Sequence, residues 1–388
     1  MKLGPFLGMN DKLEPHALQV KDVGTYVQDA LDVVFTNTGR IERAAGTTTI
    51  ASLAGAHSLW SDGIRTFYVL ASRLYRIDSF TTFASTLLAT LTSNAAMSYV
   101  GFNGEVYYSN GTNIGRLTSA DAPEPMTLAT PTTPTVTATT GTLPAGWYHV
   151  SISYTNDSGE EGGATPSVAT QLTATGGLTI TLPGASAGAT HFRIYVSGTN
   201  ATVMTRHSTV TTATTSVTVT APASTIGASP TTKLLQPMPA GTLTLHNGRL
   251  LSTSGKIITF SEPWNFGLYD PAKNFISFAE DVSVVVPAQN GVYIAADLTR
   301  WFAGADIAAP ETVQDILPYG AVPGTAFKHP DNSSVGWLGH KGLVVADTQG
   351  QAKAIQDDNL ELDYRTKTSG AVVLREKATS LTAWESAA

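Results

Sequence analysis

Cysteine is absent from this 388-residue chain, and charged residues make up only 14% of it. Without thiols the chain cannot form disulfides or thiolate metal sites, and their absence leaves the cellular compartment open. Soluble domains usually carry about a quarter charged residues, whereas threonine, serine, glycine and alanine fill that share here. A polar but weakly charged surface suits a particle component that packs against copies of itself.

Clusters of lysine and arginine are also absent, and the net charge is −7. A surface that grips DNA needs several cations to neutralise phosphates, so none is expected, although DNA could slide past a neutral or acidic lining. No run of about 18 apolar residues is present, so we expect no membrane span. The N-terminus also lacks the apolar segment of a signal peptide.

The chain is rich in turn-forming residues, with 35 glycines and 20 prolines. Between them apolar residues alternate with polar ones, and helical periodicity is almost missing, which predicts an all-β protein. The length exceeds one ordinary core. A middle part rich in Thr, Ala, Ser and Gly, bounded by proline-containing segments, divides the chain into residues 1–122, 123–239 and 240–388.

The middle part carries short strand patterns at the spacing of a β-sandwich. They are expected at residues 136–140, 146–156, 168–173, 178–182, 191–197, 204–210 and 216–219. The tyrosine-bearing strand at 146–156, the turn at 156–160 and the Ser/Pro element at 165–167 resemble a fibronectin type III domain. The resemblance implies an immunoglobulin-like β-sandwich inserted between the two flanks.

The flanks contain a repeat with an offset of 40 residues, which places Ser58 on Ser98, Phe67 on Tyr107 and Arg76 on Arg116. That offset is close to the period of about 40–50 residues in β-propeller blades. Weaker copies are expected at residues 243–251 and 284–294, each with an Asn-Gly hairpin turn, and at 335–346. These units predict five or six propeller-like blades, with segments near both termini sharing the closing blade.

Motifs that would carry chemistry are weak or missing. The segment from Gly248 to Lys256 lacks phosphate-loop spacing, and no Ser nucleophile elbow is present. No histidine lies at metal-ligand spacing from another histidine or a glutamate, and the acidic run at 357–363 lacks the ordered spacing of a calcium loop. We therefore assign no catalytic, cofactor-binding or metal-binding residue. The scattered histidines are His16, His57, His149, His191, His207, His246, His329 and His340.

Sialidases, which are propellers, offer one enzymatic alternative. Residues 155–159 match only the first half of their Asp-box motif, and residues 61–63 form a shortened imitation. No pattern selects an arginine triad, and a carboxylate pair at catalytic separation cannot be inferred from sequence. We therefore expect the protein not to be an enzyme.

The six tryptophans could instead form a sugar-binding surface. Most lie in apolar strand patterns, which favours packing in the core, but Trp264 lies in a loop and is the one expected to be exposed. The full set is Trp60, Trp147, Trp264, Trp301, Trp337 and Trp384.

The hairpin at 245–250, the following segment at 258–265 and the segments at 290–294 and 299–302 resemble tail hub, or nozzle, β-propellers of short-tailed bacteriophages. The N-terminal segment at 38–47 fits the start of the same group. This resemblance implies a structural virion protein in the phage tail, made in the bacterial cytoplasm. It also implies a homo-oligomeric ring, expected to be a hexamer, around the channel through which double-stranded DNA passes.

Such a ring would contact the portal or head–tail adaptor and anchor tail fibres or a tail needle. The rival interpretation is a carbohydrate- or receptor-binding tail protein that exposes loop aromatics such as Trp264 and Trp301. A sialidase-like glycan hydrolase is the less favoured rival.

Overall fold

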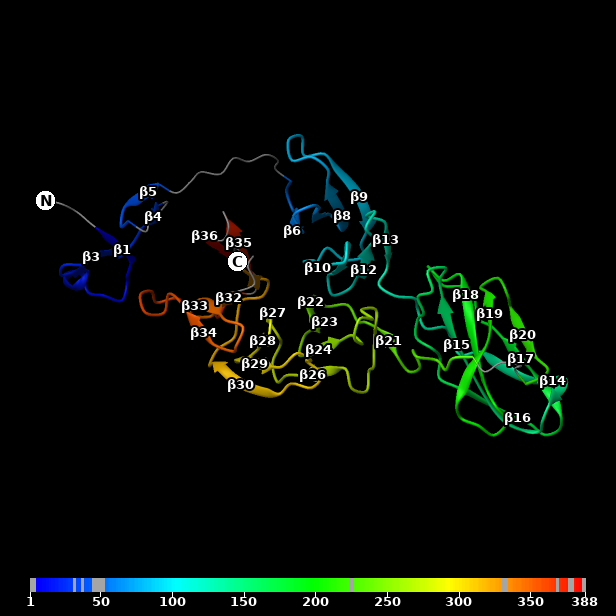
Figure 1. The fold of residues 1–388 in the computed structure, drawn as a ribbon. Coiled ribbons are helices and arrows are strands. Elements are labelled where there is room, and N and C mark those ends of the chain that lie inside the picture. Colours follow the sequence, from blue (N-terminus) through cyan, green and yellow to red (C-terminus); the bar gives the residue numbers. More distant parts are fainter. Residues whose placement is uncertain are drawn as a thin grey trace.

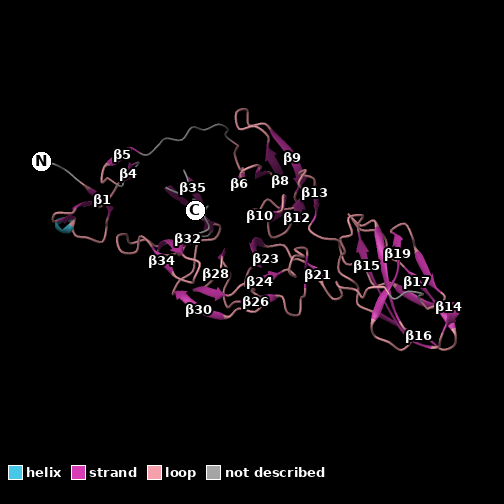
Figure 2. Cartoon of the chain, viewed as in Figure 1, coloured by secondary structure: helices cyan, strands magenta, loops and turns pink. Residues whose placement is uncertain are grey.

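The computed structural model describes residues 5–30, 33–35, 38–43, 53–222, 227–329, 334–367, 370–375 and 380–385. Within them the chain is all-β, with one short 3₁₀ turn, η1 (Pro15–Ala17), and strands linked by loops (Figure 2). No helix in this part of the chain is long and apolar enough to cross a membrane. The expected all-β class is therefore confirmed.

Five four-stranded antiparallel sheets form the body of the molecule. Each is a meander in chain order, as in a propeller blade. Their strands are β6 (His57–Ser61), β7 (Thr66–Leu70), β8 (Arg73–Ile77) and β9 (Ser85–Thr90); β10 (Ser98–Phe102), β11 (Glu105–Ser109), β12 (Ile114–Leu117) and β13 (Pro123–Pro125); β22 (Thr242–His246), β23 (Arg249–Ser254), β24 (Ile257–Phe260) and β26 (Phe275–Ser277); β27 (Val284–Ala288), β28 (Gly291–Ala295), β29 (Thr299–Ala303) and β30 (Thr312–Leu317); β31 (Phe327–Lys328), β32 (Val335–Gly339), β33 (Gly342–Ala346) and β34 (Ala352–Ala354).

The strand register reproduces the 40-residue repeat. Phe67 pairs with Arg76 in the first sheet, and Tyr107 pairs with Arg116 in the second. Phe67 lies in the core shared with the second sheet, and Tyr107 lies in the core shared with the third. Equivalent positions therefore pack each sheet against the next one, which is how a propeller buries the faces of its blades.

The sheets follow one another around a common centre (Figure 1), and each neighbouring pair shares an apolar core. Near the centre, the first strands of the second, third, fourth and fifth sheets (β10, β22, β27 and β31) line a hollow of about 320 Å³. Its lining is mainly apolar, and Lys328 is its one charged residue. A hollow of this size can hold a small molecule.

The position after the fifth sheet, where a closing blade was expected, holds a two-stranded hairpin. Its strands are β35 (Gly370–Arg375) and β36 (Ser380–Glu385), and β35 packs near β32. Among the described strands, none from the N-terminal segment pairs with this hairpin. Residues 44–52, directly before the first sheet, lie outside the described residues, so the closing blade shared by both termini stays a prediction. The described N-terminal strands pair among themselves.

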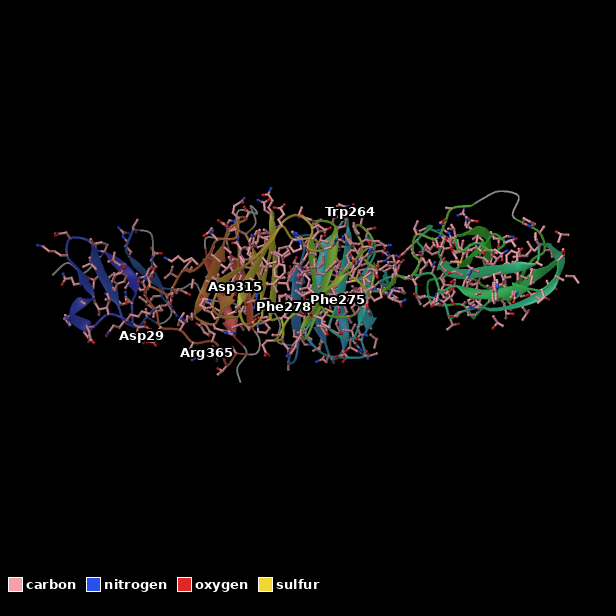
Figure 3. All side chains as sticks on the ribbon, turned by 90° about the horizontal axis from the view of Figure 1, so that it is seen from below. Asp29, Trp264, Phe275, Phe278, Asp315 and Arg365 are labelled. Carbon is pink, nitrogen blue, oxygen red and sulfur yellow. The ribbon has the colours of Figure 1, made fainter. Side chains whose placement is uncertain are left out.

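Those N-terminal strands form what we call the N-terminal arm, the described residues between 5 and 43. The arm has a three-stranded sheet and a two-stranded sheet, and Figure 3 shows it at the opposite end of the molecule from the inserted unit. The strands are β1 (Phe6–Met9), β2 (Gln19–Val20), β3 (Gly24–Val27), β4 (Val33–Phe35) and β5 (Ile41–Arg43).

Between the second and third sheets the chain forms a separate seven-stranded unit. Sheets β14-β17-β20 and β16-β15-β18-β19 enclose one core that includes Tyr148, Ile152 and Phe192. Each strand overlaps one expected from sequence, and the resemblance to fibronectin type III domains stays a prediction. The strands are β14 (Thr135–Leu143), β15 (Gly146–Thr155), β16 (Val168–Leu172), β17 (Gly176–Thr181), β18 (His191–Ser197), β19 (Met204–Thr211) and β20 (Ser216–Val219).

The two connections to this inserted unit are themselves held by strand pairing. β13 is the outer strand of the second sheet, although it begins at residue 123, where the inserted part was expected to start. On the return, β21 (Gln236–Pro237) pairs with β25 (Leu268–Tyr269). Both connections are thereby tied to the propeller-like body.

The two expected Asn-Gly turns differ. Asn247 and Gly248 both have positive φ and join β22 to β23, as a type I′ turn requires. In the other hairpin Ala288 pairs with Gly291, so the turn residues are Gln289 and Asn290. The prediction of an Asn-Gly turn at 290–291 is wrong because Gly291 belongs to β28, where a Cβ would meet the Trp301 ring and the Phe302 carbonyl.

Candidate binding cleft at Trp264

A cleft of about 430 Å³ opens where the inserted unit meets the propeller-like body. The hairpin β10–β11, the loop after β24 and the turn after β15 supply its walls. The loop after β24 packs closely against Thr127, because a Cβ at Gly267 would lie 2.4 Å from Thr127 Cβ. The three walls come from segments far apart in sequence, which is why no local motif marks the cleft.

Trp264 stands at this cleft with 71% of its surface exposed, as the sequence predicts. Figure 3 places it at one face of the sheets, toward the inserted unit. Its φ is +58°, a backbone conformation that bulky residues rarely adopt and that costs roughly 1–3 kcal/mol. The Trp264 amide donates a 2.7 Å hydrogen bond to the Gly248 carbonyl, which holds that conformation.

Gly248 also makes room for the indole. A Cβ at this position would lie 2.7 Å from Trp264 Cε2, so the ring lies directly over the hairpin turn between β22 and β23. The glycine thus serves two purposes, since the turn needs its positive φ of 78° and the indole needs its missing side chain.

Four aromatic rings contact one another at the cleft: Trp264 is exposed, Phe102 is half-buried, and Phe266 and Tyr107 are buried beneath them. Trp264 and Phe102 have ring centroids 5.9 Å apart at 44°. Phe266 meets Phe102 at 5.2 Å and Tyr107 at 5.4 Å, both edge to face. Each ring contacts its neighbour, so Trp264 and Phe102 form an aromatic platform that the two buried rings support. No gap remains between two facing rings.

Arg116 connects the body to the inserted unit at the end of this platform. Its Nη2 donates to Glu124 at 2.8 Å and to Glu160 at 2.9 Å. Burial lowers the pKa of Arg116, but attraction to Glu160 and hydrogen bonds to both carboxylates outweigh it and raise the pKa. The guanidinium is therefore a permanent cation that its two partners already neutralise.

The remaining carboxylates of the cleft are also held in place. Tyr107 donates to Glu105 at 2.6 Å, and burial together with this bond raises the pKa of Tyr107, so the phenol stays a donor. Glu161 accepts from Tyr195 at 2.5 Å and from Arg193 at 2.6 Å. The polar rim is thus pre-organised, and it carries more carboxylates than guanidinium groups.

The other tryptophans differ in placement. Trp301 and Trp337 are buried, so the rival expectation that Trp301 is an exposed loop aromatic is wrong; it lies in β29 and packs on Tyr293 at 4.4 Å. Trp60 is half-buried and stacks on Phe67 and Tyr99. Trp147, in β15, is 48% exposed despite its strand pattern. The side chain of Trp384 lies outside the described residues.

The residues weighed for metal, nucleotide and sialidase chemistry are engaged elsewhere. Asp358 pairs with Lys353 and Asp363 with Arg365. Asp62 caps its own turn and pairs with Arg65. Lys256, at the end of the glycine segment, lies near Glu280. Within the described ranges no group of three His, Asp or Glu could hold a metal ion.

The arginines of the first sheet likewise serve structure. Arg65 Nη1 and Arg76 Nη1 both donate to Asp121, at 3.1 Å and 2.5 Å, and Asp121 is only 8% exposed. This shared carboxylate ties the first sheet to the loop that precedes β13. Two arginines of the propeller-like body therefore point to one acid of the chain and not to an open site.

No family model and no curated protein matches the chain. Among solved structures it is similar to Kluyveromyces lactis Hsv2, at 9% identity and a TM-score of 0.31, over 84% of this chain and 87% of the other. It is also similar to apo AztD from Citrobacter koseri, at 10% identity and a TM-score of 0.27, over 79% and 88%. At these scores the similarity carries no argument about function.

Proposed function

We propose that the protein is a structural subunit that works in several copies, as a ring-forming component of the tail of a bacteriophage. It would act through assembly and not through catalysis. The single observation that supports this proposal most is the exposure of the N-terminal arm, whose described residues form no apolar core.

Asn10 is the one buried residue among the described residues of the arm. The apolar side chains Val20, Val23, Val34 and Ile41 are all exposed. Sheets of two or three short strands need a packed apolar face for stability. An arm built this way gains that face when it lies against another molecule, and in a homo-oligomer that molecule is the next copy.

Polar contacts at the first turn of the arm join it to the body. Asn10 and Asp11 hydrogen-bond to Asn359, and the Glu361 amide donates to Asp11 at 2.9 Å. Lys12 pairs with Asp357. These contacts set the direction in which the arm leaves the body, while its exposed sheets stay available to a neighbour.

The weakly charged surface and the closing hairpin also favour assembly. β35 and β36 form a two-stranded sheet where the other blades have four strands, and sheet edges left open pair readily with another chain. Under this proposal the copies form a ring, expected to be hexameric. Portal or adaptor proteins would flank it, fibres would anchor to it, and double-stranded DNA would pass through its middle without specific binding.

The test is the mass of the purified full-length protein in solution, followed by electron microscopy. We expect a multiple of the 40.7 kDa chain mass and ring-shaped particles. Val34→Asp with Ile41→Asp should yield monomers, whereas the matched control Ile64→Asp, at an exposed site outside the arm, should not. A monomer at every concentration would refute the proposal.

A second candidate function is receptor binding at the tail tip, in which the chain would recognise a host glycan. The observation that favours it is the exposed, pre-positioned indole of Trp264. The two functions are compatible, since a ring subunit can also carry a binding cleft.

A further inference from the structure

We infer that the Trp264 cleft binds a neutral sugar, with one pyranose ring stacked on the Trp264 indole and its hydroxyl groups bonded to the polar rim. The inference rests on the cleft alone, so it can fail while the assembly proposal stands, and the reverse also holds.

The first step is that the backbone conformation of Trp264 is energetically unfavourable. An indole exposed this far contributes little to the core, yet Trp264 has a φ of +58°, which bulky residues rarely adopt. Strained backbone that holds an exposed aromatic ring is typical of ligand sites. Packing alone would not select this arrangement.

The second step is the shape of the platform. The centroids of Trp264 and Phe102 are 5.9 Å apart, and the next two rings meet edge to face. No space remains between facing rings to enclose a cation as aromatic cages do. The exposed face of the Trp264 indole, with the half-buried Phe102 ring beside it, instead offers an apolar surface next to polar groups. Such a surface suits a flat ligand with one apolar face, which describes a pyranose ring.

The third step is the charge of the rim. Arg116 is already neutralised by Glu124 and Glu160, and Glu161 is paired with Arg193. Glu105, which accepts a hydrogen bond from the Tyr107 phenol, adds a further carboxylate. An anionic sugar would meet repulsion from these groups and find no spare guanidinium. A neutral sugar supplies hydroxyl donors, which carboxylate oxygens accept strongly. The cleft volume of about 430 Å³ fits one or two sugar rings.

The experiment is ligand-observed saturation-transfer NMR on the full-length protein with lactose, cellobiose and maltose, and with sialyllactose and choline as charged probes. We expect transfer to at least one neutral disaccharide and much weaker transfer to both charged probes. Trp264→Ala should weaken that binding at least tenfold, while Trp264→Phe should retain part of it.

Trp147→Ala is the matched control, because it removes another exposed tryptophan outside the cleft and should leave binding unchanged. Glu105→Gln should weaken binding, since it replaces a carboxylate acceptor on the rim. An unchanged thermal midpoint for each variant separates loss of binding from loss of fold.

Three results would overturn the inference. They are no transfer to any neutral disaccharide at millimolar concentration, equal binding by wild type and Trp264→Ala, or choline binding that depends on Trp264. The last result would reassign the cleft to cationic ligands.

Discussion

At the scale of single residues, the strongest constraint is the carboxylate of Asp121. It accepts from Arg65 and Arg76 and is almost fully buried. Removing one member of a buried charged group leaves the others without a partner and costs more than the pair itself contributes. Among the described residues, Arg65 would then keep only Asp62 as an ion-pair partner and Arg76 only Asp78, and both of these carboxylates are more exposed than Asp121.

We therefore expect Asp121→Asn to lower the free energy of unfolding by about 2 kcal/mol. Asp78→Asn is the matched control, since it removes an exposed partner of the same Arg76 and should cost much less. Chemical denaturation of both variants measures the difference. Equal losses for the two variants would contradict the assigned role of Asp121.

His246 makes stability depend on pH. Burial lowers the pKa of His246 below the ordinary value of 6.5; the nearby Asp306 and backbone hydrogen bonds oppose this, and Lys328 adds to it. The unfolded chain therefore takes up a proton first as the pH falls. Stability is complete above about pH 6.5 and declines below it, until the folded state is protonated as well.

His246→Gln should accordingly reduce the drop in thermal midpoint between about pH 7.5 and pH 5. Because burial also lowers the pKa of His207 and His340, the dependence should shrink and not vanish. His16→Gln, at an exposed position, serves as control. A pH dependence that His246→Gln leaves unchanged would show that this histidine is not the source.

At the scale of elements, Arg116 joins β12 to the turn after β15 through Glu160 at 2.9 Å. Together with the strand pairs at β13 and β21, this ion pair fixes how the inserted unit meets the body. The same ion pair closes one end of the Trp264 cleft.

Glu160→Gln should loosen this junction without unfolding either part. We expect faster hydrogen exchange at residues 123–128 and 236–239, with the core of β15 and β18 unaffected. Asp157→Asn, in the same turn but with a highly exposed carboxylate, is the control. Unaltered exchange in both connections would mean that strand pairing alone holds the junction.

The elements were largely predictable from sequence because alternation records which face of a strand is buried. The equal registers of Phe67 with Arg76 and Tyr107 with Arg116 follow from the 40-residue offset. Trp147 was not placed correctly, because alternation cannot say which face of β15 meets solvent. Gly291 was misassigned as a turn residue because a local Asn-Gly pair carries no information about the Trp301 ring beside it.

The cleft itself was predictable only in part. The loop position of Trp264 indicated exposure, but its partners Phe102, Arg116 and Glu160 lie more than a hundred residues away. Phe102 and Arg116 lie near Trp264 because the second sheet packs on the third, and Glu160 lies there because the inserted unit packs on the body. No local pattern encodes either packing. The arm escaped prediction for a related reason, since its short strands lack a buried face and hence an alternation to detect.

At the scale of the whole molecule, a propeller-like body carries an arm at one end and an inserted two-sheet unit at the other (Figure 3). Under the proposed assembly, the exposed apolar residues of the arm are the surface suited to join neighbouring copies.

The mass of the full-length protein in solution is therefore the most direct test of the central claim. The account predicts a defined multiple of 40.7 kDa that Val34→Asp with Ile41→Asp converts to a single chain and that Ile64→Asp preserves. A single-chain mass for the wild type at all concentrations, or an assembly that the arm variant leaves intact, would contradict it.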